Sequence, residues 1–173
     1  MAGICILSLL PGSATAGPSD PVTAATPARG DFKGRVAIRG GRKLYLECSG
    51  KGRPTVVLEA GTGDLAGVWS MRPFGPGRPV LPAVSKFTRV CAYDRPGTYL
   101  LPDQLSRSDP VAMPRSAWDV VRDERALLRA AQIPGRFVLV GHSFGGLTSR
   151  LNATTHPGPV AGLVFLRREV AES

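Results

Sequence analysis

The chain has 173 residues, of which 43% are hydrophobic and 20% are charged, and it carries a formal net charge of +9 at pH 7. A single domain is the natural interpretation of this length. The basic residues are scattered through predicted loops and helix faces, without a basic stripe and interleaved aromatic residues, so no nucleic-acid partner is expected. We attribute most of the charge to a composition rich in Arg, Ala, Gly and Pro. No Cys/His cluster has the spacing of metal ligands, so no metal or other cofactor is expected.

The amino terminus has the features of a targeting segment. A short apolar core at residues 4–10 precedes Ala14-Thr15-Ala16, a small-x-small pattern typical of signal-peptide cleavage sites. This core is too short to span a bilayer as a helix, which takes about 20 residues, so no stable membrane span is expected. We predict a signal peptide over residues 1–16, a flexible leader over 17–34, and a secreted or cell-envelope location. Because no basic residue precedes the apolar core, a cytoplasmic protein with an unstructured leader is the alternative.

Short apolar, β-branched runs recur along the chain and predict strands. The first two runs are joined by Gly40-Gly41 and predict a hairpin. The third leads into a Gly-rich segment, residues 60–64, and the last would form an exposed apolar edge if no strand followed it. The predicted strands are residues 36–38, 44–48, 55–59, 87–93, 137–140 and 160–166.

Two helices are predicted between the later strands. Ser116, with Asp119 three residues on, resembles a capping box, and Pro134-Gly135 ends the apolar periodicity that follows. A second helix follows the strand at residues 137–140. Strands that alternate with helices imply a parallel sheet with helices on both faces. The long segment 98–114 is expected to border the functional pocket.

The most informative segment is residues 137–146, an apolar run that ends in Gly-x-Ser-x-Gly and opens a helix. Small residues two positions before and two after the serine, here Gly141 and Gly145, let the backbone close a sharp strand-to-helix turn. Such a turn lifts the Ser143 hydroxyl out of the sheet. It also places the next backbone N–H groups at a helix N-terminus, where they can stabilise a developing oxyanion. The context therefore indicates a nucleophilic serine, with a plain Gly-rich turn as the alternative.

Together these segments resemble the α/β-hydrolase superfamily over residues 35–166. The resemblance implies a mostly parallel α/β sheet with helices on both faces. It also implies an esterase-like serine hydrolase that acts on a small-molecule ester or related acyl substrate. A serine at the corner argues against epoxide-hydrolase and dehalogenase relatives, which need a carboxylate there. The matching segments, in the superfamily's order, are the leading hairpin, Leu58–Gly61 with its Gly-rich continuation, Tyr93–Gly97 and Leu139–Gly146.

The resemblance also assigns roles to single residues. Ser143 would be the nucleophile, and the backbone N–H groups of Thr62 and Phe144 would form the oxyanion hole. In the superfamily's strand order the strands that carry Cys48 and Cys91 lie side by side, which makes these cysteines candidates for a disulfide. Two buried free thiols are the alternative.

One part of the superfamily pattern is missing. Triads of this fold run Ser, then Asp or Glu, then His along the chain, yet only His142 and His156 occur in it. His142 adjoins the serine and is expected to point away from its reactive side. His156 lies roughly 20 Å along a continuous helix, whereas a general base must come within about 3 Å. Glu169 and Glu172 fall in a charged tail, residues 167–173, so the acid and the base remain unassigned.

The length agrees with this gap, because α/β folds of this type run to roughly 200–250 residues. We expect the amino-terminal part of a hydrolase domain, truncated after about the sixth strand. One hypothesis is a serine hydrolase represented by its nucleophile-bearing half and inactive alone. The other is a non-catalytic or degenerate module of the same fold. The sequence indicates no oligomeric state.

Overall fold

A computed structural model describes residues 30–71, 77–101, 104–133 and 135–166 of the chain. The expected signal peptide, most of the leader and the charged tail lie outside these residues. These described residues form two sheets, one of six strands and one of two. The strands are β1 (Phe32–Ala37), β2 (Lys43–Ser49), β3 (Thr55–Glu59), β4 (Val90–Tyr93), β5 (Tyr99–Leu101), β6 (Gln104–Leu105), β7 (Phe137–His142) and β8 (Val160–Leu166).

The six-stranded sheet has the order β1-β2-β4-β3-β7-β8. Strands β1 and β2 form an antiparallel hairpin, and β2 pairs antiparallel with β4. From β4 onward the neighbours β3, β7 and β8 are parallel. The mostly parallel α/β sheet predicted from the sequence is therefore confirmed.

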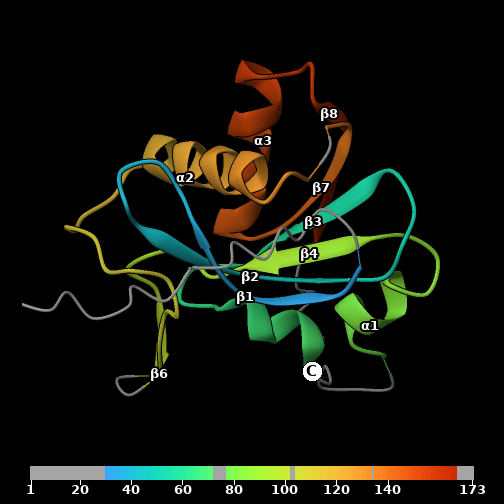
Figure 1. The fold of residues 1–173 in the computed structure, drawn as a ribbon, viewed down its shortest axis with the longest axis horizontal. Helices are drawn as coiled ribbons and strands as arrows, with labels where there is room; N and C mark the ends of the chain where they lie inside the picture. The colour runs from blue at the N-terminus through green and yellow to red at the C-terminus, as the bar shows by residue number, and fades with distance from the viewer. Residues whose placement is uncertain (1–29, 72–76, 102–103, 134, 167–173) are drawn as a thin grey trace, which may run out of the picture.

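Helices cover both faces of this sheet, as Figure 1 shows, with α2 and α3 on one side and η1 and α1 on the other. Each face has its own apolar core. Residues such as Leu127 of α2 and Leu139 of β7 share one core, and Trp69 of η1 and Leu58 of β3 share the other. The helices are η1 (Ala66–Ser70), α1 (Val80–Val84), α2 (Ala117–Ala130) and α3 (Phe144–Thr155).

The start of α2 follows from its sequence. Ser116 accepts a hydrogen bond from the Asp119 backbone N–H, and Asp119 Oδ2 accepts one from the Ser116 backbone N–H at 2.9 Å. This reciprocal capping box satisfies two backbone donors that a helix N-terminus otherwise leaves free. The capping residues predicted from the sequence are thus confirmed.

Two strand predictions differ from the structure in detail, and a third agrees with it. Strand β1 begins at Phe32, inside the expected leader. Strand β4 begins at Val90 rather than at residue 87, because Phe87 is 74% exposed and still belongs to the turn after α1. Strand β8 forms over the predicted residues and has the exposed apolar side chains expected of an edge: among the described residues it pairs with β7 alone, and Phe165 is 56% exposed.

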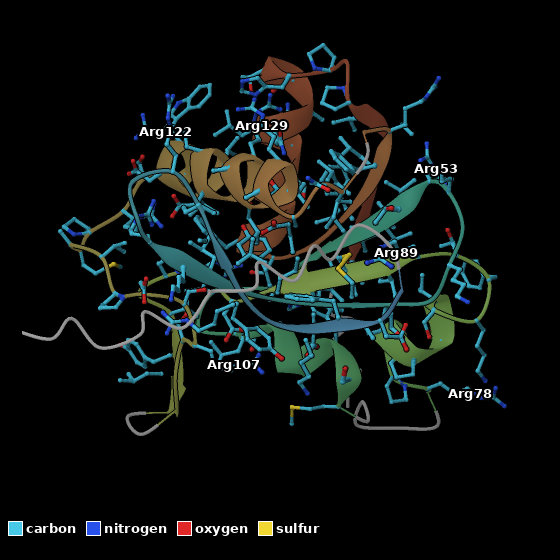
Figure 2. All side chains as sticks on the ribbon, in the orientation of Figure 1. Arg53, Arg78, Arg89, Arg107, Arg122 and Arg129 are labelled. Carbon is cyan, nitrogen blue, oxygen red and sulfur yellow. A yellow bond between two sulfur atoms is a disulfide. The ribbon has the colours of Figure 1, made fainter. Side chains whose placement is uncertain are left out.

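Of the arginines labelled in Figure 2, Arg122 and Arg129 lie on α2, and Arg78 and Arg107 lie across the sheet from them. No helix among the described residues is long and apolar enough to cross a membrane.

Cys48 and Cys91 lie directly opposite each other in the β2–β4 ladder and are bonded through sulfur, the yellow bond in Figure 2. Their Cα atoms are 4.0 Å apart. This is closer than the usual separation of about 4.4–6.8 Å for a disulfide. Directly opposed residues of an antiparallel pair have Cα atoms about 4.5–5.5 Å apart, so the strand pairing itself brings the two cysteines within bridging distance.

We predict that oxidised protein contains this bond in solution. Peptide mapping without reduction should recover one linked peptide pair that joins Cys48 to Cys91, and both residues as alkylatable thiols would refute the bond. The bridge spans 43 residues of sequence. Replacing both cysteines by alanine should lower the free energy of unfolding by about 4 kcal/mol, the loop-closure value for that length.

Candidate functional site

Ser143 lies at the corner between β7 and α3, as the sequence predicts. It is the N-cap of α3, with φ 53° and ψ −122°, and it is exposed. Positive φ is uncommon for a residue with a Cβ and costs of order 1–3 kcal/mol unless the surroundings impose it. The fold therefore imposes an unfavourable backbone on this one serine.

The glycines beside the corner explain how the fold imposes it. A Cβ on Gly145 would lie 2.2 Å from the Glu59 carbonyl oxygen and 2.6 Å from that of Ala60. A Cβ on Gly141 would lie 2.5 Å from the backbone of Gly146. Both contacts involve backbone atoms, which cannot rotate away, so the first turn of α3 packs on β3 and β7 only without side chains at these positions.

Two of the hollows lined by described residues adjoin the corner. The first has a volume of about 780 Å³ and is lined by Ser143, His142, Arg150 and exposed apolar residues of α3 and β8. The second has a volume of about 490 Å³, and both Thr62 and Phe144 line it. Thr98 and Tyr99 line it too, so the segment 98–114 borders a pocket as expected. The structure thus brings the Gly-rich loop after β3 to the residue that follows Ser143.

A buried carboxylate fixes the neighbouring loops. Asp94, fully buried, accepts hydrogen bonds from the Ala66 backbone N–H at 2.8 Å and from the Arg107 side chain at 2.7 and 2.8 Å. The Arg107 guanidinium carbon also lies 3.4 Å from the centroid of the Tyr45 ring. These bonds hold the start of η1 and the segment after β6 to the end of β4.

Two further carboxyls are buried beneath the corner, Glu59 at the end of β3 and Glu124 on α2, both 0% exposed. Burial raises the pKa of Glu59 to about 7, against the opposing charge of Arg95, whose Nη1 lies 3.8 Å from Oε2. Burial, and next the charge of Glu59, raises the pKa of Glu124 well above its ordinary value. Glu124 accepts a 2.8 Å hydrogen bond from the Asn152 side chain of α3. Helix α3 is therefore hydrogen-bonded to one member of a pair of buried carboxyls.

The two histidines lie apart from each other. His142 Nδ1 is 3.9 Å from Asp64 Oδ2, and the ring covers Gly61, where a Cβ would be 2.9 Å from Nδ1. His156 is the C-cap of α3, at the far end of that helix from Ser143. Its pKa is lowered by desolvation and by the charges of Arg125 and Arg129. Within the described part of the chain, no hydrogen bond joins Ser143 to either histidine, and no group of three potential ligands could hold a metal ion.

A large part of the chain, including this arrangement, matches a known protein family. The profile of the alpha/beta hydrolase family matches residues 56–166. The chain belongs to the alpha/beta hydrolase family. This match begins in β3 and ends with β8, so it contains the corner, the Gly-rich loop and the buried carboxyls.

Individual proteins are similar to parts of the chain. An uncharacterized protein of Schizosaccharomyces pombe is 37% identical over 87 residues, which is 50% of this chain and 15% of that protein. RutD of Variovorax paradoxus, provisionally named a carbamate hydrolase, is 35% identical over 64% of this chain and 36% of its own length. The solved structure of Est816, an N-acyl homoserine lactone degrading enzyme, is 26% identical with a TM-score of 0.61, covering 77% of this chain and 44% of that one. The chain spans less than half the length of each.

The sequence of this alpha/beta hydrolase predicts the serine corner and the Gly-rich loop. It does not predict the roles of the polar residues beneath them. Glu59 and Arg95 stood inside segments assigned to the family pattern, without a role of their own. A charged residue at the end of an otherwise apolar run, as in Thr55–Glu59, was the available signal. Such a residue lies at the carboxyl end of a parallel strand, where sites of open α/β sheets form.

We predict that Gly145→Ala destabilises the fold, because the new methyl group would overlap two backbone carbonyls. The expected loss is at least about 3 kcal/mol of unfolding free energy in urea, the upper range for overpacking. Gly67→Ala is the matched control, since a Cβ there has no atom within 4 Å, and should stay within about 0.5 kcal/mol. Equal stability of the two variants would contradict the close packing.

The raised pKa of Glu59 predicts how stability depends on pH. Between its ordinary value of 4.5 and about 7, the folded chain keeps a proton that the unfolded chain has lost. The stability that this retained proton gives the fold is complete below the ordinary pKa. It is lost as the pH rises through the pKa of the folded chain, at about 1.4 kcal/mol per pKa unit. Glu59→Gln should therefore flatten the fall in unfolding free energy between about pH 5 and 8.

Asp119→Asn is the control for this measurement. Hydrogen bonds from Ser116 lower the pKa of Asp119 to about 2, so its contribution is lost only as the pH falls toward that value. This control variant should keep the wild-type slope above about pH 5. If Glu59→Gln kept that slope as well, the carboxyl would be ionised in the folded chain.

Proposed function

We propose that Ser143 is the nucleophile of a serine hydrolase that acts on a small-molecule ester or related acyl substrate. The observation that carries this proposal is the backbone of Ser143, held at φ 53° and ψ −122° between a strand and a helix N-terminus. Strained backbone at a single exposed serine of a hydrolase fold is the geometry that presents a hydroxyl to a substrate carbonyl.

In this mechanism Ser143 Oγ attacks the acyl carbon while a base removes its proton. The backbone N–H groups of Thr62 and Phe144 stabilise the oxyanion, which collapses as the bond to the leaving alcohol breaks and the base returns its proton. Water then releases the acid from the acyl-serine by the same route. Both N–H residues border one hollow next to the corner, which supports their assignment.

The base is not assigned to either histidine. His156 lies at the opposite end of α3 from Ser143, about 20 Å away at 1.5 Å rise per residue. His142 faces Asp64. We therefore propose that the described residues supply the nucleophile and the oxyanion hole without the base, so that this chain alone is inactive in turnover. The same observation favours the second candidate, a non-catalytic module of the family.

The acyl class of substrate is supported by the names of two relatives, one a carbamate hydrolase and the other a degrader of acyl homoserine lactones. Carbamates and lactones share an acyl carbon bonded to a heteroatom leaving group.

The apolar run and small-x-small pattern at residues 4–16 support secretion or an envelope location.

We predict slow, stoichiometric acylation of Ser143 by p-nitrophenyl acetate, without sustained turnover. A serine hydroxyl is a weak nucleophile without a base, and triad enzymes that lack it retain about 10³–10⁴-fold acceleration over water. Mass spectrometry of the full chain should place the acetyl group on Ser143, and Ser143→Ala should remove it.

Ser70→Ala, which changes an exposed serine at the end of η1, should leave acylation unchanged. Equal, negligible labelling of the wild type and Ser143→Ala would support the non-catalytic module. Sustained turnover that Ser143→Ala abolishes would reveal a base within this chain, and His156→Ala would be the first variant to examine.

A further inference from the structure

Arg95 is a buried arginine, only 5% exposed, two residues beyond the end of β4. Its side chain contacts both segments that adjoin Ser143. The guanidinium donates from Nη1 to the Ala60 carbonyl oxygen at 2.5 Å and from Nη2 to that of Gly61. It therefore holds two successive carbonyls of the Gly-rich loop with one planar fork, which a lysine ammonium cannot reproduce.

The same guanidinium contacts the first residue of α3. Its central carbon lies 5.5 Å from the centroid of the Phe144 ring, within the range of a cation–π interaction. Glu59 Oε2, 3.8 Å from Nη1, provides the opposite charge. Arg95 thus lies between the loop that contains Thr62 and the residue that follows Ser143.

These contacts determine the direction of one N–H group. The Gly61–Thr62 peptide is trans, since the cis bonds of the described chain both precede proline. In a trans peptide the carbonyl and the N–H point in opposite directions. The Gly61 carbonyl is oriented by Arg95 and also accepts from the Asp64 backbone N–H at 3.2 Å. The Thr62 N–H must therefore point away from the guanidinium.

We propose that Arg95 is a positioning residue that holds the Gly-rich loop and the start of α3 in the one arrangement in which the Thr62 and Phe144 N–H groups serve a single oxyanion. The proposal rests on the proposed function for the role of these N–H groups. The contacts of Arg95 themselves do not depend on that function. They form a clamp that consists of hydrogen bonds to two backbone carbonyls and one contact with an aromatic ring. Loss of the two guanidinium hydrogen bonds should make the Gly-rich loop more mobile, while the strands of the sheet stay rigid.

The test is the ¹⁵N relaxation of the full chain, read as order parameters at Thr62, Gly63 and Phe144. In the wild type we expect values near those of rigid backbone, about 0.85, and in Arg95→Gln we expect Thr62 and Gly63 to fall toward about 0.6. Strands β3 and β7 should keep their values. Arg122→Gln is the matched control, because Arg122 is an exposed arginine that also pairs with a carboxylate, Asp119.

A role in stability alone would lower the unfolding free energy and leave these order parameters unchanged, which would overturn the proposal. Arg95→Lys keeps the charge opposite Glu59 but loses the fork, so it should restore rigidity only in part, and full restoration would overturn the two-carbonyl clamp. If Arg95→Gln fails to fold because Glu59 is left unpaired, the double variant Glu59→Gln/Arg95→Gln buries no lone charge and gives the same measurement.

Acylation of Ser143 by p-nitrophenyl acetate separates this proposal from the proposed function. Arg95→Gln should slow it by about 10²-fold, as does removal of one oxyanion donor. A loosened loop with unchanged acylation would overturn the link to the oxyanion. If the wild type and Ser143→Ala were labelled equally, the proposed function would fail, while the order parameters would still decide whether Arg95 holds the loop.

Discussion

The close packing of α3 against the ends of β3 and β7 is the constraint on which the rest of the structure depends. At Gly145 the helix backbone meets the carbonyls of Glu59 and Ala60 at a distance that excludes a Cβ. This packing requires the chain to turn sharply at Ser143 and brings the start of α3 beside the Gly-rich loop. The strained serine and the closeness of the loop to the start of α3 therefore go together with one backbone contact.

The polar residues beneath this contact serve a different purpose from the apolar cores on the two faces. Glu59, Glu124 and Asn152 come from a strand and two helices, and all three side chains are buried. Buried carboxyls are costly unless they are protonated or paired. A hydrogen bond between Asn152 and Glu124 has direction, which apolar contacts lack, so it fixes how α2 and α3 lie relative to each other.

Local patterns in the sequence sufficed to predict most of the fold. The capping box at Ser116, the glycines around Ser143 and the apolar runs act within a few residues of themselves, so they could be read directly. The strand order, and with it the approach of Cys48 to Cys91, followed only from the resemblance to a family. The partners of Glu59 and Arg95 could not be predicted, because they depend on which distant segments the fold brings together. The start of β4 was misplaced because Phe87 is apolar and yet exposed.

Strand β8 bears on how this protein must be handled. Among the described residues it pairs with β7 alone, and Leu163, Val164, Phe165 and Leu166 are each at least 36% exposed. A strand with free backbone donors and acceptors, flanked by apolar side chains, is a template on which other chains can add. Association through such an edge depends on concentration, salt and temperature. A rate or a melting temperature therefore describes a single chain only when sedimentation or light scattering at the same concentration shows a monomer.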